Sequence, residues 1–236
     1  RACMKIGITC YPTYGGSGTV ATELGQSLAR RGHSIHFITT SIPYRLSSGF
    51  IDNVFFHEVQ VFNYPLFDYV PYSLSLASKM AQVALREDLD LFHVHYAVPH
   101  ATSAYLARNI IDEKKRIPVI TTLHGTDITL VGNDPSYYDI TKFSIEQSDA
   151  ITAVSNYLRD ETRTRFAIDN EITVIPNFVD TDRFTITHSP HEDCLRRNDE
   201  KILMHISNFR PVKRVQDIVS IFEGVAAKIP ARLVLI

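Results

Sequence analysis

The stretch KIGITCYPTYGGSGTVA, residues 5–21, decides the fold of this chain. A short apolar run at residues 6–10 leads into the segment GGSG at residues 15–18, and a helical pattern follows at residues 19–31. A buried strand, a glycine turn and a helix make the first unit of a parallel α/β sheet. Glycine permits positive φ and close backbone approach, and a helix N-terminus offers free N–H groups and partial positive charge. The stretch therefore predicts a site for an anion.

Strands and helices alternate along the rest of the chain. Short β-branched or aliphatic runs, typical of strands covered on both faces, are expected at residues 35–39, 54–61, 91–95, 119–123, 151–154, 172–175, 202–206 and 233–236. Amphipathic helices are expected between them at residues 73–87, 99–111, 156–165 and 212–228. This order predicts an α/β fold with a doubly wound, parallel, Rossmann-like sheet.

The alternation breaks at residues 185–200, which are rich in His, Asp, Arg and Pro and are typical of a linker. We expect a Rossmann-like N-terminal domain over residues 1–190 and the first βαβ unit of a second domain over residues 191–236. One such unit cannot bury a core alone. The second segment is therefore expected to pack on something else or to belong to a truncated domain.

Composition excludes some classes of function. The net charge is -2 and charged residues make up 21% of the chain, which argues against a nucleic-acid or membrane footprint. The three cysteines, Cys3, Cys10 and Cys194, are widely spaced and form no CxxC pair, so a reducing, cytoplasmic location is predicted. The sequence leaves open whether the protein forms a homo-oligomer.

The glycine segment admits other interpretations. Residues 16–21, GSGTVA, fit the dinucleotide pattern G-x-G-x-x-A, but the second strand ends ITTS at residues 38–41 without the acid that would hold a ribose. Binding of NAD is therefore disfavoured. A P-loop is excluded because no Gly-Lys-Ser/Thr follows. A tight turn that only packs the helix on the strand remains an alternative.

Two histidine motifs, HVHY at 93–96 and TTLHGTD at 121–127, end adjacent predicted strands. Ligand sites of doubly wound sheets lie at the carboxyl ends of the strands. His124 precedes a glycine and further polar residues, which favours a ligand site there. A metal site using His93, His95 and His124 is disfavoured because no acidic or Cys cluster completes it. His93 alone is also compatible with a core position.

A third motif, SNFRPVKR at residues 207–214, follows the predicted strand 202–206. Lysine and arginine at a strand-to-helix turn suit a diphosphate leaving group, by charge and by hydrogen bonding. The alternative is a solvated basic loop.

Together these motifs resemble the retaining GT-B glycosyltransferases, the family that includes sucrose-phosphate synthase and phosphatidylinositol mannosyltransferase. Supporting features are GG at 15–16, RGH at 31–33, HG at 124–125, VS at 154–155, IPNFVD at 175–180 and Lys213. The longer runs ITCYP at 8–12, HVHYAVPHA at 93–101, TTLHGTDIT at 121–129, SIEQSD at 144–149 and SNFRPVKRVQD at 207–217 are similar to the branch of that family in bacillithiol biosynthesis.

The resemblance implies two Rossmann-like domains facing a cleft, a UDP-GlcNAc donor, L-malate as acceptor, retention of the α-configuration and no metal or other cofactor. It implies that His124 and Lys213 are catalytic, that Asn208, Arg210 and Lys213 bind the donor, and that the acceptor is bound by Gly16, Ser17, Gly18, Tyr96, Thr122 and Asn177.

Two departures from the family pattern qualify these implications. Asn208 stands where many relatives have arginine, and Arg210 is displaced by two positions. The family's pair of donor-binding glutamates is absent from the sequence, so this chain alone is expected to be inactive. Three alternatives remain open: a sibling transferase with a lipid or sugar-phosphate acceptor, a non-catalytic anion-binding fragment, and a nicotinamide-dependent dehydrogenase.

Overall fold

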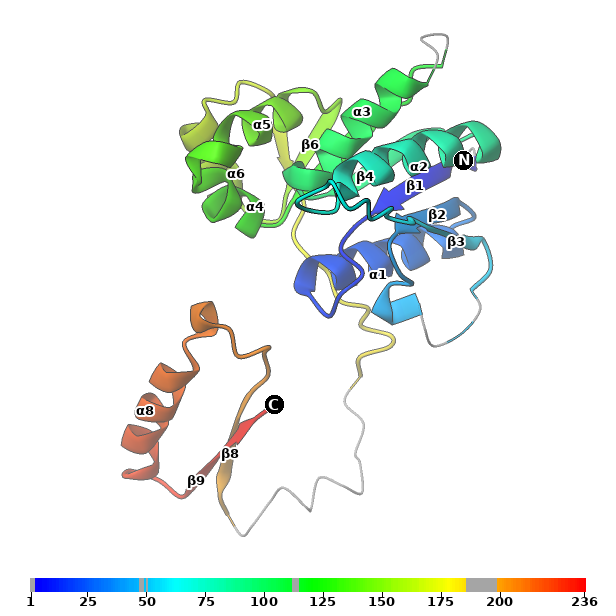
Figure 1. The fold of residues 1–236 in the computed structure, drawn as a ribbon. Coiled ribbons are helices and arrows are strands. Elements are labelled where there is room, and N and C mark those ends of the chain that lie inside the picture. Colours follow the sequence, from blue (N-terminus) through cyan, green and yellow to red (C-terminus); the bar gives the residue numbers. More distant parts are fainter. Residues whose placement is uncertain (1–2, 47–48, 50, 112–114, 186–198) are drawn as a thin grey trace. The chain divides into compact units, whose positions relative to one another are not determined.

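A computed structural model describes residues 3–46, 49, 51–111, 115–185 and 199–236 (Figure 1). The chain divides into two compact units, Arg1–Phe178 and Val179–Ile236, which we call unit 1 and unit 2. Most of the predicted linker at 185–200, the predicted domain boundary after residue 190, and Cys194 lie outside the described residues.

Unit 1 is built on a seven-stranded parallel sheet with the order β3-β2-β1-β4-β5-β6-β7. Its strands are β1 (Lys5–Thr9), β2 (Ser34–Thr39), β3 (Val54–Glu58), β4 (Leu91–His95), β5 (Val119–Leu123), β6 (Ala150–Ala153) and β7 (Ile172–Val174). The prediction of a doubly wound parallel sheet is confirmed. The strand order reverses between β1 and β4, which are neighbours in space although β2 and β3 lie between them in sequence.

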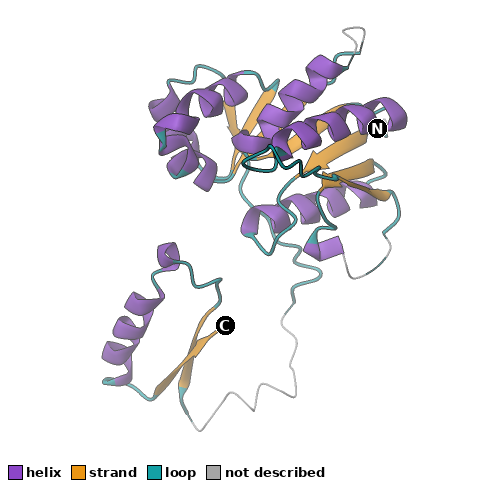
Figure 2. Cartoon of the chain, in the orientation of Figure 1, coloured by secondary structure: helices purple, strands orange, loops and turns teal. Residues whose placement is uncertain are grey.

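Helices cover both faces of this sheet (Figure 2). They are α1 (Gly16–Arg30), α2 (Tyr72–Glu87), α3 (Thr102–Ile110), α4 (Thr126–Thr129), α5 (Pro135–Glu146) and α6 (Asn156–Phe166), with short turns η1 (Tyr44–Leu46), η2 (Ala97–Ala101) and η3 (Val131–Asn133). Side chains alternate across the strands: Phe37 packs in the cluster that includes α1, whereas Ile38 packs in the cluster that includes α2 and α3. Both faces of the sheet are therefore apolar, as the continuous apolar runs predicted.

The longest element that the sequence pattern did not predict is α5. Asp134 caps it by accepting a hydrogen bond from the backbone N–H of Ser136 at 2.9 Å, and Pro135 occupies the first turn. Aspartate followed by proline is a typical helix start. That signal was present in the sequence, but the apolar spacing that follows it is weak.

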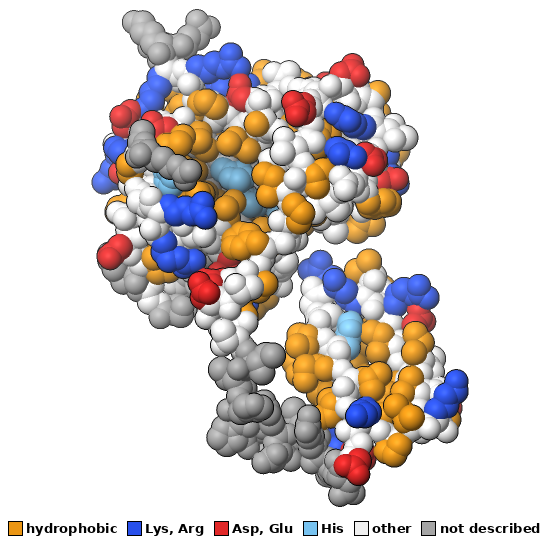
Figure 3. Space-filling view, turned by 180° about the vertical axis from the view of Figure 1, so that it is seen from behind, with side chains coloured by type: hydrophobic (Ala, Val, Ile, Leu, Met, Phe, Trp, Pro, Cys, Tyr) orange, Lys and Arg blue, Asp and Glu red, His pale blue; other side chains and the backbone are white. Residues whose placement is uncertain are grey.

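Unit 2 comprises β8 (Lys201–His205), η4 (Pro211–Lys213), α8 (Val215–Ala226) and β9 (Ala231–Leu235), with β8 and β9 parallel. None of its described residues is fully buried. Apolar side chains gather on the face of this unit that Figure 3 shows. The exposed large hydrophobic residues of unit 2 include Met204, Ile206, Val219 and Ile221. Two strands and one helix have too little surface to enclose a core, as the sequence indicated.

No helix among the described residues is long and apolar enough to cross a membrane.

Candidate active site at the carboxyl edge of the sheet

The segments that follow β1, β4 and β5 meet at one edge of unit 1. The ring of Tyr11, after β1, lies 5.4 Å from that of Tyr96, after β4, and Tyr96 lies 5.4 Å from the ring of His124, after β5. This point is where the strand order reverses, and open α/β sheets bind ligands at such a switch point. The structure therefore brings together two of the predicted histidine-motif residues and Tyr11, which lies between β1 and the glycine segment.

The glycine segment forms the first turn of α1. The backbone N–H of Thr19 donates to the carbonyl oxygen of Gly15 at 3.0 Å, which closes the first helical bond. The N–H groups of the turn, at residues 16–18, have no partner inside the helix by geometry. They point out of the positive end of a helix of 15 residues. This turn can bind an anion.

Close approach, and not an unusual backbone angle, is what requires glycine at one position of this segment. Positive φ occurs among the described glycines at Gly32, Gly49 and Gly125, but not in the segment 15–18. A Cβ on Gly18 would lie 2.4 Å from the carbonyl oxygen of Tyr11, whereas one on Gly16 would meet nothing within 4 Å. Close packing of helix on strand thus requires Gly18.

Tyr96 lies between Tyr11 and His124 and contacts both rings. Its φ is 89°, an unusual value for a bulky side chain, and such outliers cluster at ligand sites. Its phenolic oxygen lies 2.9 Å from Thr126 Oγ1, across from β5. Burial, and then the nearby Tyr96 and Asp127, raise the pKa of Tyr11. Tyr11 therefore presents a neutral hydroxyl at neutral pH.

Asp127 holds the turn after β5. This carboxylate is fully buried and accepts hydrogen bonds from the backbone N–H groups of Gly125 at 2.9 Å, Ala97 at 3.2 Å and His124 at 3.3 Å. Burial raises its pKa, and the backbone hydrogen bonds act against that rise. Asp127 thus ties the turn after β5 to the turn after β4. It is a structural anchor of the site.

His124 stands at the centre of the site. Its Nε2 atom lies 2.8 Å from His95 Nδ1, and its ring is tilted by 31° against that of Tyr96. Burial, followed by the nearby His93 and His100, lowers the pKa of His124 to about 4. The next residue, Gly125, has a φ of 121°, a backbone conformation that favours glycine at this position. His124 is consequently a neutral imidazole near neutral pH.

Two predicted acceptor residues lie further from this cluster. The hydroxyl of Thr122 is nearly buried inside the sheet, 2.8 Å from His93 Nε2 and 2.7 Å from Thr152 Oγ1. Asn177 is exposed and follows β7, the strand at the end of the sheet. Their binding roles stay predictions.

The predicted donor residues, Asn208, Arg210 and Lys213, belong to unit 2. They lie on the exposed loop after β8 and in the turn η4, which starts at Pro211. The prediction of a strand-to-helix turn is confirmed, although the helix α8 begins at Val215 rather than at residue 212.

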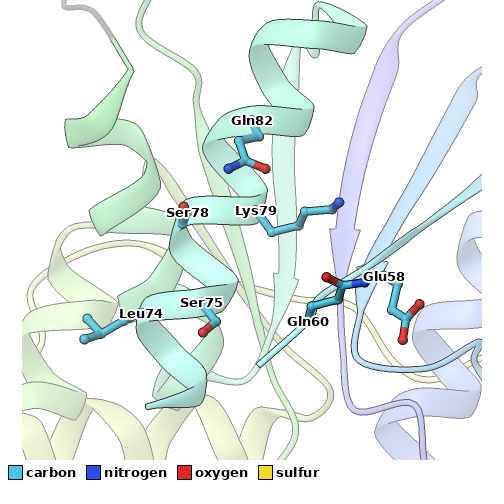
Figure 4. A pocket seen from close by; sticks show the side chains of 7 residues that line it. All are labelled: Glu58, Gln60, Leu74, Ser75, Ser78, Lys79 and Gln82. Carbon is cyan, nitrogen blue, oxygen red and sulfur yellow. The ribbon is translucent and has the colours of Figure 1, made fainter. Parts of the chain in front are cut away.

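Hollows of similar size open at two places on unit 1. One, of about 600 Å³, borders Tyr11 at the carboxyl edge and is lined also by Tyr72, Pro99, Leu130, Asp134 and Tyr137, residues that the sequence patterns did not single out. The other, of about 580 Å³, lies along α2 beside Glu58 and Gln60 and contains none of the predicted site residues (Figure 4). Within the described ranges, no three His, Cys, Asp or Glu side chains are placed to hold a metal ion.

Comparison with known proteins gives a consistent assignment. The model of one family, Glycosyltransferase Family 4, matches residues 14–183. The chain is 52% identical over 236 residues to N-acetyl-alpha-D-glucosaminyl L-malate synthase of Bacillus anthracis, covering 99% of this chain and 61% of that relative. It is 27% identical over 128 residues to the putative teichuronic acid biosynthesis glycosyltransferase TuaC of Bacillus subtilis, covering 52% of this chain and 31% of TuaC. The chain thus spans less than two thirds of the length of these relatives.

Solved structures share the fold. Anabaena Alr3699/HepE in complex with UDP and glucose matches 98% of this chain and 60% of its own, with a TM-score of 0.73 at 17% identity. Sucrose-phosphate synthase of Thermosynechococcus elongatus matches 98% of this chain and 62% of its own, with a TM-score of 0.72 at 16% identity. Both are GT-B glycosyltransferase structures by fold, and the GT-B prediction is confirmed.

Proposed function

The chain belongs to glycosyltransferase family 4, and from that membership we propose that the protein transfers N-acetylglucosamine from UDP-GlcNAc to the hydroxyl of L-malate. The observation that carries this proposal is the 52% identity, over 99% of the chain, to a synthase that bears those two groups in its name. The reaction would be the first step of bacillithiol biosynthesis. A cytoplasmic location stays a prediction, and the oligomeric state stays open.

The acceptor is held by unit 1. L-Malate is a dicarboxylate, and the free N–H groups of the α1 turn, Ser17 among them, suit one of its carboxylates by charge and by hydrogen bonding. Tyr96 lies beside the same edge, next to Tyr11. We propose that Gly16, Ser17 and Gly18 bind the carboxylate and that Tyr96 orients the rest of the molecule.

His124 and unit 2 act on the donor. A neutral His124 hydrogen-bonds an oxygen of the transferred sugar as positive charge develops at C1. Lys213, with Arg210 and Asn208, neutralises the diphosphate as the C1–O bond to UDP breaks. The malate hydroxyl oxygen bonds C1 on the face that UDP leaves, and its proton passes to the departing phosphate oxygen. The α-configuration is thereby retained.

Proton NMR of the full-length protein with UDP-GlcNAc and L-malate tests this proposal. The expected result is a new α-anomeric doublet together with one equivalent of UDP. Succinate, which has both carboxylates but no hydroxyl, is the matched control and should give neither signal. UDP release that is indifferent to malate would overturn the acceptor assignment. An absence of any product with malate, but a product with another hydroxy acid, would move the assignment to that acid.

A further inference from the structure

Three imidazole rings form a column from the interior of the sheet to the candidate site. The ring of His95 lies 4.8 Å from that of His93 and 5.1 Å from that of His124, with interplanar angles of 20° and 26°. His95 is fully buried, and its backbone carbonyl accepts a hydrogen bond from His100 Nδ1. The middle ring of the column is therefore buried between the other two, and it contacts His124, the residue proposed to bind the donor.

One hydrogen bond joins the two rings, between His95 Nδ1 and His124 Nε2 at 2.8 Å. Burial lowers the pKa of both side chains, of His124 to about 4 and of His95 further below its ordinary value. Each ring is thus neutral at physiological pH and carries a single N–H. Either His95 donates to His124, or His124 donates to His95.

The other nitrogen of His95 decides between these arrangements. His95 Nε2 is buried, and it forms no hydrogen bond with any residue that the structure describes. If His124 donated, the proton of His95 would sit on Nε2, as a buried N–H without an acceptor. If His95 donates from Nδ1, only a lone pair is left without a partner. Orphaned buried N–H groups are the rarer and costlier of the two.

We propose that His95 is a positioning residue that donates from Nδ1 to His124 Nε2 and so fixes the proton of His124 on Nδ1. His124 then presents an N–H to the ligand, and it acts as a hydrogen-bond donor to a sugar or phosphate oxygen, not as a base. This proposal rests on the proposed function for the identity of the ligand. The tautomer itself follows from unit 1 alone.

Nitrogen-15 NMR of the full-length protein, labelled in its histidine rings, measures the tautomer directly. The His124 signals are assigned by their loss in His124→Asn. The expected result is a protonated Nδ1 and a bare Nε2 on His124. A protonated Nε2 on His124 in the unsubstituted protein overturns the proposal. Because this readout needs no turnover, it stands even if the acceptor or donor proves to be another compound.

Two substitutions test the dependence on His95. In asparagine the amide nitrogen is three bonds from Cα, as Nδ1 is in histidine, so His95→Asn keeps a donor near the same place. Leucine in His95→Leu fills similar space and has no donor. We expect His95→Asn to keep the His124 tautomer and most of kcat, and His95→Leu to lose that tautomer and at least tenfold in kcat. Equal losses in both variants with an unchanged tautomer would overturn the positioning role.

Folding is checked separately, by thermal unfolding of each variant. If His95→Leu fails to fold, the unsubstituted protein and His95→Asn still decide the question through the tautomer. If the full-length protein makes no GlcNAc-malate, the proposed function fails while the tautomer assignment is still confirmed or overturned by NMR.

Discussion

The carbonyl oxygen of Tyr11 lies 2.4 Å from the position that a Cβ on Gly18 would occupy. This contact sets the spacing between the end of β1 and the first turn of α1, where the anion is proposed to bind. Because this oxygen belongs to the backbone, it has little freedom to move aside. A methyl group at residue 18 must therefore displace the helix.

Gly18→Ala should destabilise the protein by about 1–3 kcal/mol, the usual cost of forcing a methyl group into a packed site. Gly16→Ala is the matched control, because a Cβ there meets nothing within 4 Å. Thermal unfolding measures both. If the two variants unfold at the same temperature, the close approach at Gly18 is not needed. A raised KM for malate in Gly16→Ala, without loss of stability, would support ligand contact at that turn.

Asp127→Asn should destabilise unit 1 by about 2 kcal/mol and lower kcat. The carboxylate accepts three backbone N–H groups, and charge-assisted bonds of this kind are each worth about 1.5–3 kcal/mol. An amide loses the charge and turns an NH₂ toward a buried donor. Asp160→Asn, at an exposed ion pair with Arg159, should change stability very little. Urea unfolding compares the two variants, and equal stability would contradict the anchoring role.

Acid should weaken the folded state between pH 6.5 and pH 5. His95 and His100 are fully buried, and burial lowers their pKa values, that of His100 to about 4. The unfolded chain therefore binds protons at these residues before the folded one does, so the free energy of unfolding falls as the pH falls. Each residue contributes a slope of up to about 1.4 kcal/mol per pH unit.

Urea unfolding followed by tyrosine fluorescence can measure that slope, because the chain has no tryptophan. The variant His100→Gln should show a shallower dependence than the unsubstituted protein. A free energy of unfolding that is constant over this pH range would show that the buried histidines titrate in the folded protein as they do in the unfolded chain, and would contradict the lowered pKa values.

Lys213→Ala should lower kcat by about 100-fold or more, the usual cost of removing one group that stabilises developing negative charge. Lys213→Arg keeps the charge and should recover part of the loss. Lys228→Ala removes the same charge from an exposed position at the end of α8 and should have no effect. Steady-state kinetics with the full-length protein decide the outcome. Equal effects at residues 213 and 228 would show that only net charge matters.

Cys10 should resist alkylation in the folded protein. It is buried at the end of β1, and burial raises the pKa of its thiol to about 12. Cys3 is exposed. Iodoacetamide followed by peptide mass spectrometry should find Cys3 modified under native conditions and Cys10 modified only in denaturant. Alkylation of both at the same rate would contradict the burial of β1.

The strands were predictable from sequence because each is a short apolar run that fits a sheet covered on both faces. The third strand was predicted over residues 54–61, but β3 ends at Glu58. The prediction was too long because Val59 and Val61 continue the pattern of apolar residues beyond the end of the strand. That β1 and β4 pair with each other was predictable only from the fold class. Their pairing joins Thr9 to Val94, which no local pattern reveals.

The position of the site at the carboxyl ends of the strands was predictable, but the hydrogen-bond partners of its side chains were not. Asp127 was grouped with the residues that face a ligand, yet its carboxylate turns inward to three backbone N–H groups. The hydroxyl of Thr122 likewise bonds Thr152 on the next strand. Both partnerships depend on which strands lie side by side. Composition at the end of one strand does not contain that information.

All seven strands of unit 1 are parallel, so their starts share the edge of the sheet opposite the candidate site. Lys5 begins β1 at that opposite edge. The five residues of β1 span about 16 Å between the two edges. A linker joined to Lys5, on a bead or a sensor chip, would therefore hold unit 1 by the edge of the sheet that lies opposite the candidate site.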